Sequence, residues 1–195
     1  ALSLFVNVKA YAQRVATGNP SVYKVTMIKF EISPNSGTTW TAIADTSITI
    51  DIASVTAGQS VWSWVSGGSF PAGIYNLLRH TLSATFTMQG FVYYNVTDTT
   101  YFTTVSGIAS AAGNVTNTAL MTGYGEQAIT IADDGVTISG GRIVSTETDN
   151  LTITPGTTLT ERISFDVRNT LELYNIGGGI YAFFPGQPVV DSTAQ

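Results

Sequence analysis

The chain has 195 residues and no cysteine, with 8 basic and 13 acidic side chains and a net charge of −5. Charged residues make up 11% of it, less than half of the roughly 25% usual in soluble domains. The composition excludes disulfides and cysteine-ligated metals. With so few basic residues we expect no nucleic-acid partner, and the apolar runs are far shorter than the roughly 20 residues of a membrane span.

Residues 1–15 alternate in the pattern of a strand with one apolar face. The side chains on that face are Leu2, Leu4, Val6, Val8 and Ala10. Polar side chains alternate with them, apart from Phe5. Gly18, Asn19 and Pro20 then break the pattern. The sequence therefore predicts a long strand at the start of the chain.

Further strands are expected at short spacing along the rest of the chain. They cover residues 22–33, 40–43, 47–53, 74–89, 91–94, 101–105, 128–132, 136–139, 142–146, 151–154, 158–167, 170–174 and 180–184. Gly, Pro, Asn and Asp separate them, and no segment keeps a helical period. The pattern predicts one all-β domain over residues 1–195, an antiparallel β-sandwich or jelly roll. Residues 185–195 lack a packing pattern and are expected to form an extended tail.

The side chains that could carry catalysis are few. His80 is the only histidine, so Ser-His-Asp or Cys-His chemistry would have to use it. No nucleophile motif accompanies it, and the acidic residues are scattered. We therefore expect a structural strand histidine and no catalytic centre, with a small hydrolase as the least favoured interpretation.

Two adjacent carboxylates offer the one candidate metal site. Asp133 and Asp134 precede Gly135, so they form either a turn or, with Glu126 or Asp149, a calcium site of carboxylates and loop carbonyls. No other cofactor is expected. Because calcium loops usually carry a longer acidic repeat, the turn is the favoured interpretation.

Aromatic and asparagine residues suggest surface contacts. Trp62 and Trp64 share one face if their segment is a strand, and they either pack in the core or, if exposed, stack on carbohydrate. Three Asn-X-Thr acceptor sequences begin at Asn95, Asn114 and Asn150, at or near predicted turns. We expect these asparagines to be candidate sites of glycan attachment.

Residues 29–33, 37–40, 50–52 and 70–75, with Arg79, resemble prokaryotic surface-lipoprotein domains with transthyretin-like sandwiches. As a whole, the chain is similar to β-sandwich filament subunits of the TasA/camelysin kind and to archaeal or bacterial donor-strand fibres. The shared features are the alternating strand at the start, the Thr-rich strands and the lack of Cys. This resemblance implies that the first strand leaves its own subunit and completes a sheet of the next.

Burial of apolar side chains makes such an exchange physically plausible. Each Leu or Val that enters a neighbour's groove contributes about 1.5–3 kcal/mol. We therefore expect a structural subunit of an extracellular surface filament whose partners are copies of itself. The opening at Ala1 fits removal of a signal peptide, and a shortened chain equally. The alternative function is a monomeric surface module that binds carbohydrate or protein.

Overall fold

The computed structural model describes residues 12–55, 71–131, 138–154 and 161–194. In this part of the chain every long element is a β-strand and every strand pairing is antiparallel. The one helical element described is the 3-10 turn Thr118–Leu120, where the Asn117 side chain accepts a hydrogen bond from the Ala119 amide. The predicted all-β, antiparallel class is confirmed, and the arrangement is β-sandwich-like.

The largest sheet is built around strand β2. Its strands are β2 (Val22–Ser33), β3 (Thr41–Ala44), β4 (Ile48–Asp51), β5 (Gly73–Ser83), β6 (Thr85–Gln89), β10 (Gln127–Thr130), β11 (Ile138–Ser139) and β12 (Arg142–Ile153). They follow the order β10-β6-β2-β5-β12-β11, and β3 and β4 also pair with β2. Strand β2 has the bounds expected from the alternation of its residues.

Three smaller sheets contain the remaining strands. One has the order β1-β14-β15, from Gln13–Gly18, Leu171–Gly177 and Ile180–Pro185. Another has the order β7-β8-β9, from Phe91–Tyr94, Thr99–Phe102 and Ser110–Ala111. The last pairs β13 (Glu161–Asp166) with β16 (Val189–Ala194). Each of these sheets therefore has outer strands that could accept a further strand.

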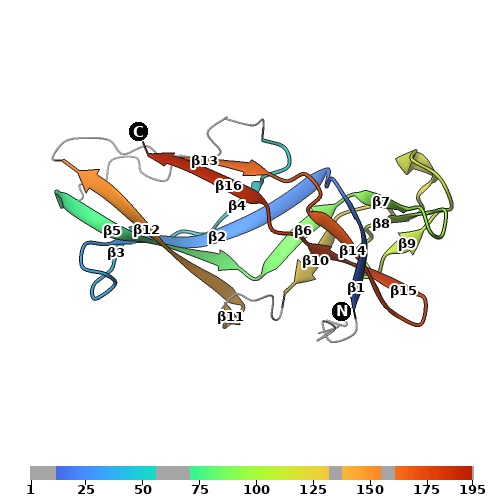
Figure 1. Ribbon diagram of the computed structural model, residues 1–195, viewed down its shortest axis with the longest axis horizontal. Helices are drawn as coiled ribbons and strands as arrows, with labels where there is room; N and C mark the ends of the chain where they lie inside the picture. The colour runs from blue at the N-terminus through green and yellow to red at the C-terminus, as the bar shows by residue number, and fades with distance from the viewer. Residues whose placement is uncertain (1–11, 56–70, 132–137, 155–160, 195) are drawn as a thin grey trace.

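The molecule is elongated in the view of Figure 1. The start of β5, the end of β12 and strand β3 lie at one end of its long axis, on the left of the view. Strands β7, β8, β9 and β15 lie at the other end, on the right. The two ends are thus built from different sheets.

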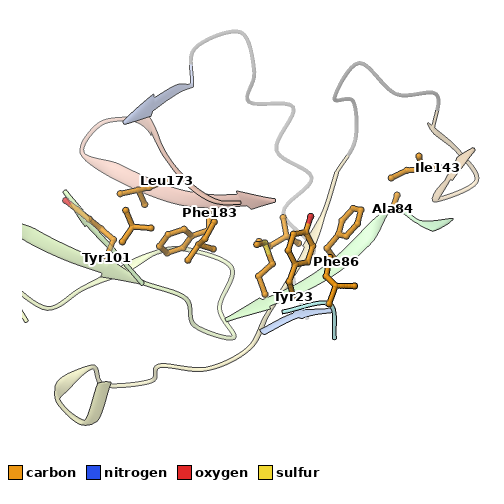
Figure 2. Close-up of a cluster of buried hydrophobic side chains, with 12 residues drawn as sticks. Tyr23, Ala84, Phe86, Tyr101, Ile143, Leu173 and Phe183 are labelled. Atoms are coloured by element: carbon orange, nitrogen blue, oxygen red, sulfur yellow. The ribbon is translucent and has the colours of Figure 1, made fainter. Parts of the chain in front are cut away.

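Two clusters of buried apolar side chains form the core. The larger one joins β2, β6, β8, β14 and β15 and is drawn in Figure 2. Its members are Tyr23, Ile52, Ala84, Phe86, Met88, Val92, Tyr101, Ile129, Ile143, Leu171, Leu173 and Phe183. The smaller cluster lies on β2, β5 and β12 and contains Phe30, Ile32, Tyr75, Leu78, Leu151 and Ile153.

Two glycines allow segments to approach closely between the smaller sheets. A Cβ atom on Gly18 of β1 would lie 2.8 Å from the carbonyl oxygen of Phe91 in β7. A Cβ atom on Gly90 would lie 2.7 Å from a methyl group of Leu171 in β14. A larger residue at Gly18 would therefore push against the backbone of β7, and one at Gly90 would displace the Leu171 side chain and crowd Pro20.

Several predicted strands differ from the observed ones. The single strand expected over residues 74–89 is two strands, because at Ala84 the amide bonds to Gly141 and the carbonyl accepts from Ile131. The strands expected at 142–146 and 151–154 are one strand, β12, whose register shifts between Thr148 and Leu151. A local bulge thus replaces the predicted turn.

The last described residues form a paired strand. Residues 185–195 were expected to form an extended tail, and within them Val189–Ala194 form β16, which pairs along its length with β13. At the other end, the described strand β1 covers only the last part of the predicted strand 1–15 and continues to Gly18. Residues 1–11 lie outside the described structure.

Candidate functional site

Several predicted site residues fall outside the described part of the chain. These are the proposed strand face Leu2, Leu4, Val6, Val8 and Ala10, the tryptophans Trp62 and Trp64, and the calcium candidates Asp133 and Asp134. Their predicted roles stay predictions. The other candidates can be placed.

Two of the three glycan candidates lie near one another. Asn95 is exposed in the turn between β7 and β8. Asn114 is exposed after β9, and its amide donates a hydrogen bond of 2.9 Å to the Asp98 carboxylate. The Tyr93 hydroxyl donates to the same carboxylate oxygen at 2.6 Å, which raises the pKa of that tyrosine. Asp98 therefore ties the two asparagine-bearing turns together.

The third glycan candidate lies in a different setting. Asn150 is exposed within β12, next to the register shift, and not in the predicted turn. Strand β12 runs toward the end of the molecule opposite β7–β9 (Figure 1). Glycans at Asn95 and Asn150 would thus project from opposite ends of the molecule.

His80 is a strand residue that packs against an aromatic ring. It lies on β5 opposite Phe30 of β2, and the two rings stack with 4.7 Å between their centroids. Burial lowers the pKa of His80 below its ordinary value, and Glu147 on β12 opposes this shift. This environment holds the imidazole neutral near pH 7.

The acidic residues of the described structure are dispersed or paired with bases. Glu126, a candidate calcium ligand, instead binds the Lys24 amino group at 2.6 Å. Among the described residues, no group of three or more acidic or histidine side chains could hold a metal ion.

One polar cluster on β2 and β5 was not predicted from the sequence. Glu31, only 6% exposed, accepts from the Lys29 amino group at 3.0 Å and from Arg79 at 2.8 and 2.7 Å. The Arg79 guanidinium lies over the Trp40 ring, 4.0 Å from its centroid, in a cation–π contact. We call Lys29, Glu31, Trp40 and Arg79 the charged cluster. The sequence places Lys29 and Glu31 on one face of a strand and could have indicated that pair. It does not indicate Arg79, because Arg79 meets Glu31 only through the pairing of β2 with β5.

The opposite end of the molecule is almost free of charge. Asp98 is the one charged residue among residues 90–125, and residues 175–190 contain none. We call these two stretches the uncharged end; Figure 1 shows β7–β9 and β15 together there. Depletion of charge is typical of the centre of a protein–protein interface.

Exposed apolar side chains gather on this end. Val105 is 86% exposed, Ile108 45% and Ile180 47%. The Ala109 amide, next to Ile108, donates a 3.1 Å hydrogen bond to the Tyr181 carbonyl, next to Ile180, and the Thr104 hydroxyl, next to Val105, donates to the Ile108 carbonyl at 3.2 Å. These two bonds bring the loop that holds Val105 and Ile108 to the start of β15. We call Val105, Ile108 and Ile180 the apolar patch. Single exposed apolar residues are ordinary, but a contiguous group on a surface without charge is a candidate contact site.

An ion pair anchors the strand from which the undescribed first residues emerge. Arg14 of β1 donates to the Glu172 carboxylate on β14, which also accepts from the Tyr174 hydroxyl at 2.9 Å. The carboxylate raises the pKa of Arg14. Strand β1 is thereby fixed to β14 at the residues nearest to the preceding segment.

No helix in the described part of the chain is long and apolar enough to cross a membrane.

Comparisons with known proteins gave no relatives: no family model, no curated protein and no solved structure matches the chain. The candidate surfaces therefore have to be interpreted from their own chemistry.

Proposed function

We propose that the chain is a structural subunit of an extracellular surface filament, in which the first residues of each copy add a strand to the next copy. One observation carries this proposal. Residues 1–11 alternate with a single apolar face and lead directly into β1, an outer strand of its sheet. A strand that follows an outer strand can pair with the sheet of another copy, since exchange of an identical element between copies is a low-cost route to association.

The energy available from such an exchange is sufficient for assembly. Leu2, Leu4, Val6 and Val8 together would contribute about 6–12 kcal/mol if buried by a neighbour. Hydrogen bonds between strands would add to this and would cover an exposed sheet edge. Because donor and acceptor are different surfaces, the contact is head-to-tail, and it produces a fibre when the rotation between successive copies does not close a ring.

Features of the described structure support the proposal. The low content of charge, 11% of residues, suits a surface that contacts copies of itself more than a monomer that relies on charge for solubility. The exposed Asn95, Asn114 and Asn150 suit a protein that carries glycans outside the cell. Several sheets end in outer strands that could accept another strand.

Electron microscopy of two matched double variants tests the proposal. In Leu4→Asp/Val6→Asp, charges replace side chains on the apolar face, and burying them costs several kcal/mol. We expect the natural chain to form fibres and this variant to remain a folded monomer. The control, Ser3→Asp/Asn7→Asp, places the same charges on the opposite face of the same strand and should still form fibres.

Deletion of residues 1–9 separates a donated strand from an ordinary first strand. A donated strand can be removed without lowering the melting temperature of the monomer, whereas an intramolecular strand leaves exposed core when it is lost. Fibres formed by the Leu4→Asp/Val6→Asp variant would overturn the proposal. A natural chain that stays monomeric would favour the alternative, a surface module that binds carbohydrate or protein.

A further inference from the structure

We infer that the apolar patch, formed by Val105, Ile108 and Ile180, is the surface on which the first eleven residues of a neighbouring copy dock. This inference rests on the proposed function and adds the location of the acceptor. The described structure offers four independent reasons for it.

The first reason is the exposure of the patch itself. Its three side chains are 86%, 45% and 47% exposed, and the hydrogen bonds from Ala109 to Tyr181 and from Thr104 to Ile108 fix their loop against the start of β15. Ile180 begins β15, which is an outer strand of the β1-β14-β15 sheet. An added strand would find apolar side chains and a sheet edge at the same place.

The second reason is the charge of the two surfaces. The uncharged end has one charged residue, Asp98, over residues 90–125 and none over residues 175–190. Residues 1–11 likewise carry one charged side chain, Lys9, of the opposite sign. A nearly neutral strand can dock on a nearly neutral surface without the cost of burying unpaired charge. A charged peptide or a nucleic acid would fit this surface poorly.

The third reason is the place where the segment emerges. Gln13 of β1 pairs with Asn175 of β14, immediately before the turn that leads to Ile180. Residues 1–11 would span about 36 Å if they were fully extended as a strand, at about 3.3 Å per residue. A segment of this reach can cross from its own subunit to the same end of an adjacent one.

The fourth reason is the contrast with the other end of the molecule. Exposed apolar side chains there, such as Ile74 at 64%, lie on a sheet that also carries the charged cluster. A neutral strand would have to approach Lys29, Arg79 and their carboxylate partners. The apolar patch is therefore the better acceptor.

Complementation between two defective variants tests the inference. Ile108→Asp/Ile180→Asp keeps the donor segment and breaks the acceptor; Leu4→Asp/Val6→Asp keeps the acceptor and breaks the donor. We expect each variant alone to be a monomer by sedimentation, with an unchanged melting temperature. An equimolar mixture should give a heterodimer of one copy of each. Ile74→Asp is the matched control at the other end and should form fibres like the natural chain.

The outcomes separate this inference from the proposed function. If the natural chain forms fibres and Ile108→Asp/Ile180→Asp also does, the acceptor lies elsewhere and the filament proposal stands. The natural chain could instead form only closed dimers that the Ile108→Asp/Ile180→Asp change abolishes. In that case the apolar patch is the acceptor, and the filament proposal is wrong. If Ile74→Asp abolishes assembly as completely as the patch variant, the inference is overturned.

Discussion

At the end of the molecule that holds β3 and the start of β5, the buried polar side chains include Ser33 and an acid, Glu31, which is bound to two bases. At the end that holds β7, β8 and β9, the buried polar side chains are threonines and a glutamine: Thr100, Thr103, Thr104 and Gln127. The first end has charged side chains around the buried acid, whereas residues 90–125 and 175–190 at the second end carry one charged side chain, Asp98. The two ends therefore differ in charge, and the nearly neutral end is the one on which we propose that a neighbouring copy docks.

Neutralising the acid at the centre of the charged cluster should have the largest effect on stability. Breaking one side of a fully buried ion pair costs about 3–5 kcal/mol. The Lys29 and Arg79 side chains are 32% and 28% exposed and can turn toward water, so for Glu31→Gln we expect a loss of about 2–3 kcal/mol. Urea unfolding followed by circular dichroism measures it.

Glu126→Gln is the matched control, since it is the same substitution in a pair whose members are 35% and 43% exposed. Exposed pairs contribute roughly 0–1 kcal/mol, so this variant should unfold almost like the natural chain. If the two variants lost equal free energy of unfolding, burial of Glu31 would not contribute to stability. The proposed difference between the two ends would then be wrong.

Hydroxyl groups should have the corresponding role at the uncharged end, with a smaller effect. The buried Thr103 hydroxyl donates to the Gly125 carbonyl at 2.8 Å and accepts from the Gly90 amide at 3.1 Å. Thr103→Val keeps the shape and leaves both backbone groups unpaired, so we expect a loss of about 1–3 kcal/mol in the free energy of unfolding.

The neighbouring Thr100 provides the control. Its hydroxyl is also buried but finds no hydrogen-bond partner among the described residues. Replacing that hydroxyl by a methyl group in Thr100→Val should be neutral or stabilising. If Thr100→Val costs as much as Thr103→Val, the paired hydroxyl is not what stabilises this end.

The smallest expected effect is a pH dependence from His80. Because burial lowers its pKa in the folded chain, the unfolded chain binds a proton at higher pH than the folded one. The free energy of unfolding should therefore fall as the pH drops below about 6.5, the ordinary pKa of histidine. The loss of unfolding free energy caused by His80 should stop growing once the pH is below the pKa of His80 in the folded chain. His80→Phe keeps the stacking on Phe30 and should remove this component.

Unfolding curves of both proteins between pH 8 and pH 5 measure the effect. The carboxylates titrate in both, so the difference between the two free energies isolates the histidine. A difference that stays constant over this range would mean that His80 is accessible to water in the folded chain.

Most strands could be predicted from the sequence because alternation records burial of one face. Strand β2 was predicted with its observed bounds, and so was β7. Strand β16 was missed because Pro185 and Pro188 precede it and its pairing with β13 leaves no local pattern. The bulge in β12 was mistaken for a turn, because a register shift depends on the neighbouring strand β5 and not on the local residues.

The candidate surfaces were less predictable than the strands. The charged cluster joins Glu31 to Arg79 across paired strands, and sequence spacing does not reveal which strands are neighbours. The apolar patch depends on a hydrogen bond between Ala109 in a loop and Tyr181 in β15, and the periodicity of the sequence does not predict such a contact. The scarcity of charge over residues 90–125 was visible in the sequence, and it is the signal that could have located the uncharged end.

Cross-linking of a double-cysteine variant, Val6→Cys/Ile180→Cys, can detect the proposed exchange of strands between copies. The natural chain has no cysteine, so a short bis-maleimide joins only the introduced pair. Docking of each first segment on the next copy predicts a ladder of covalent dimers, trimers and longer polymers on a denaturing gel. A single band of internally cross-linked monomer would contradict it, because the segment would then lie on its own subunit.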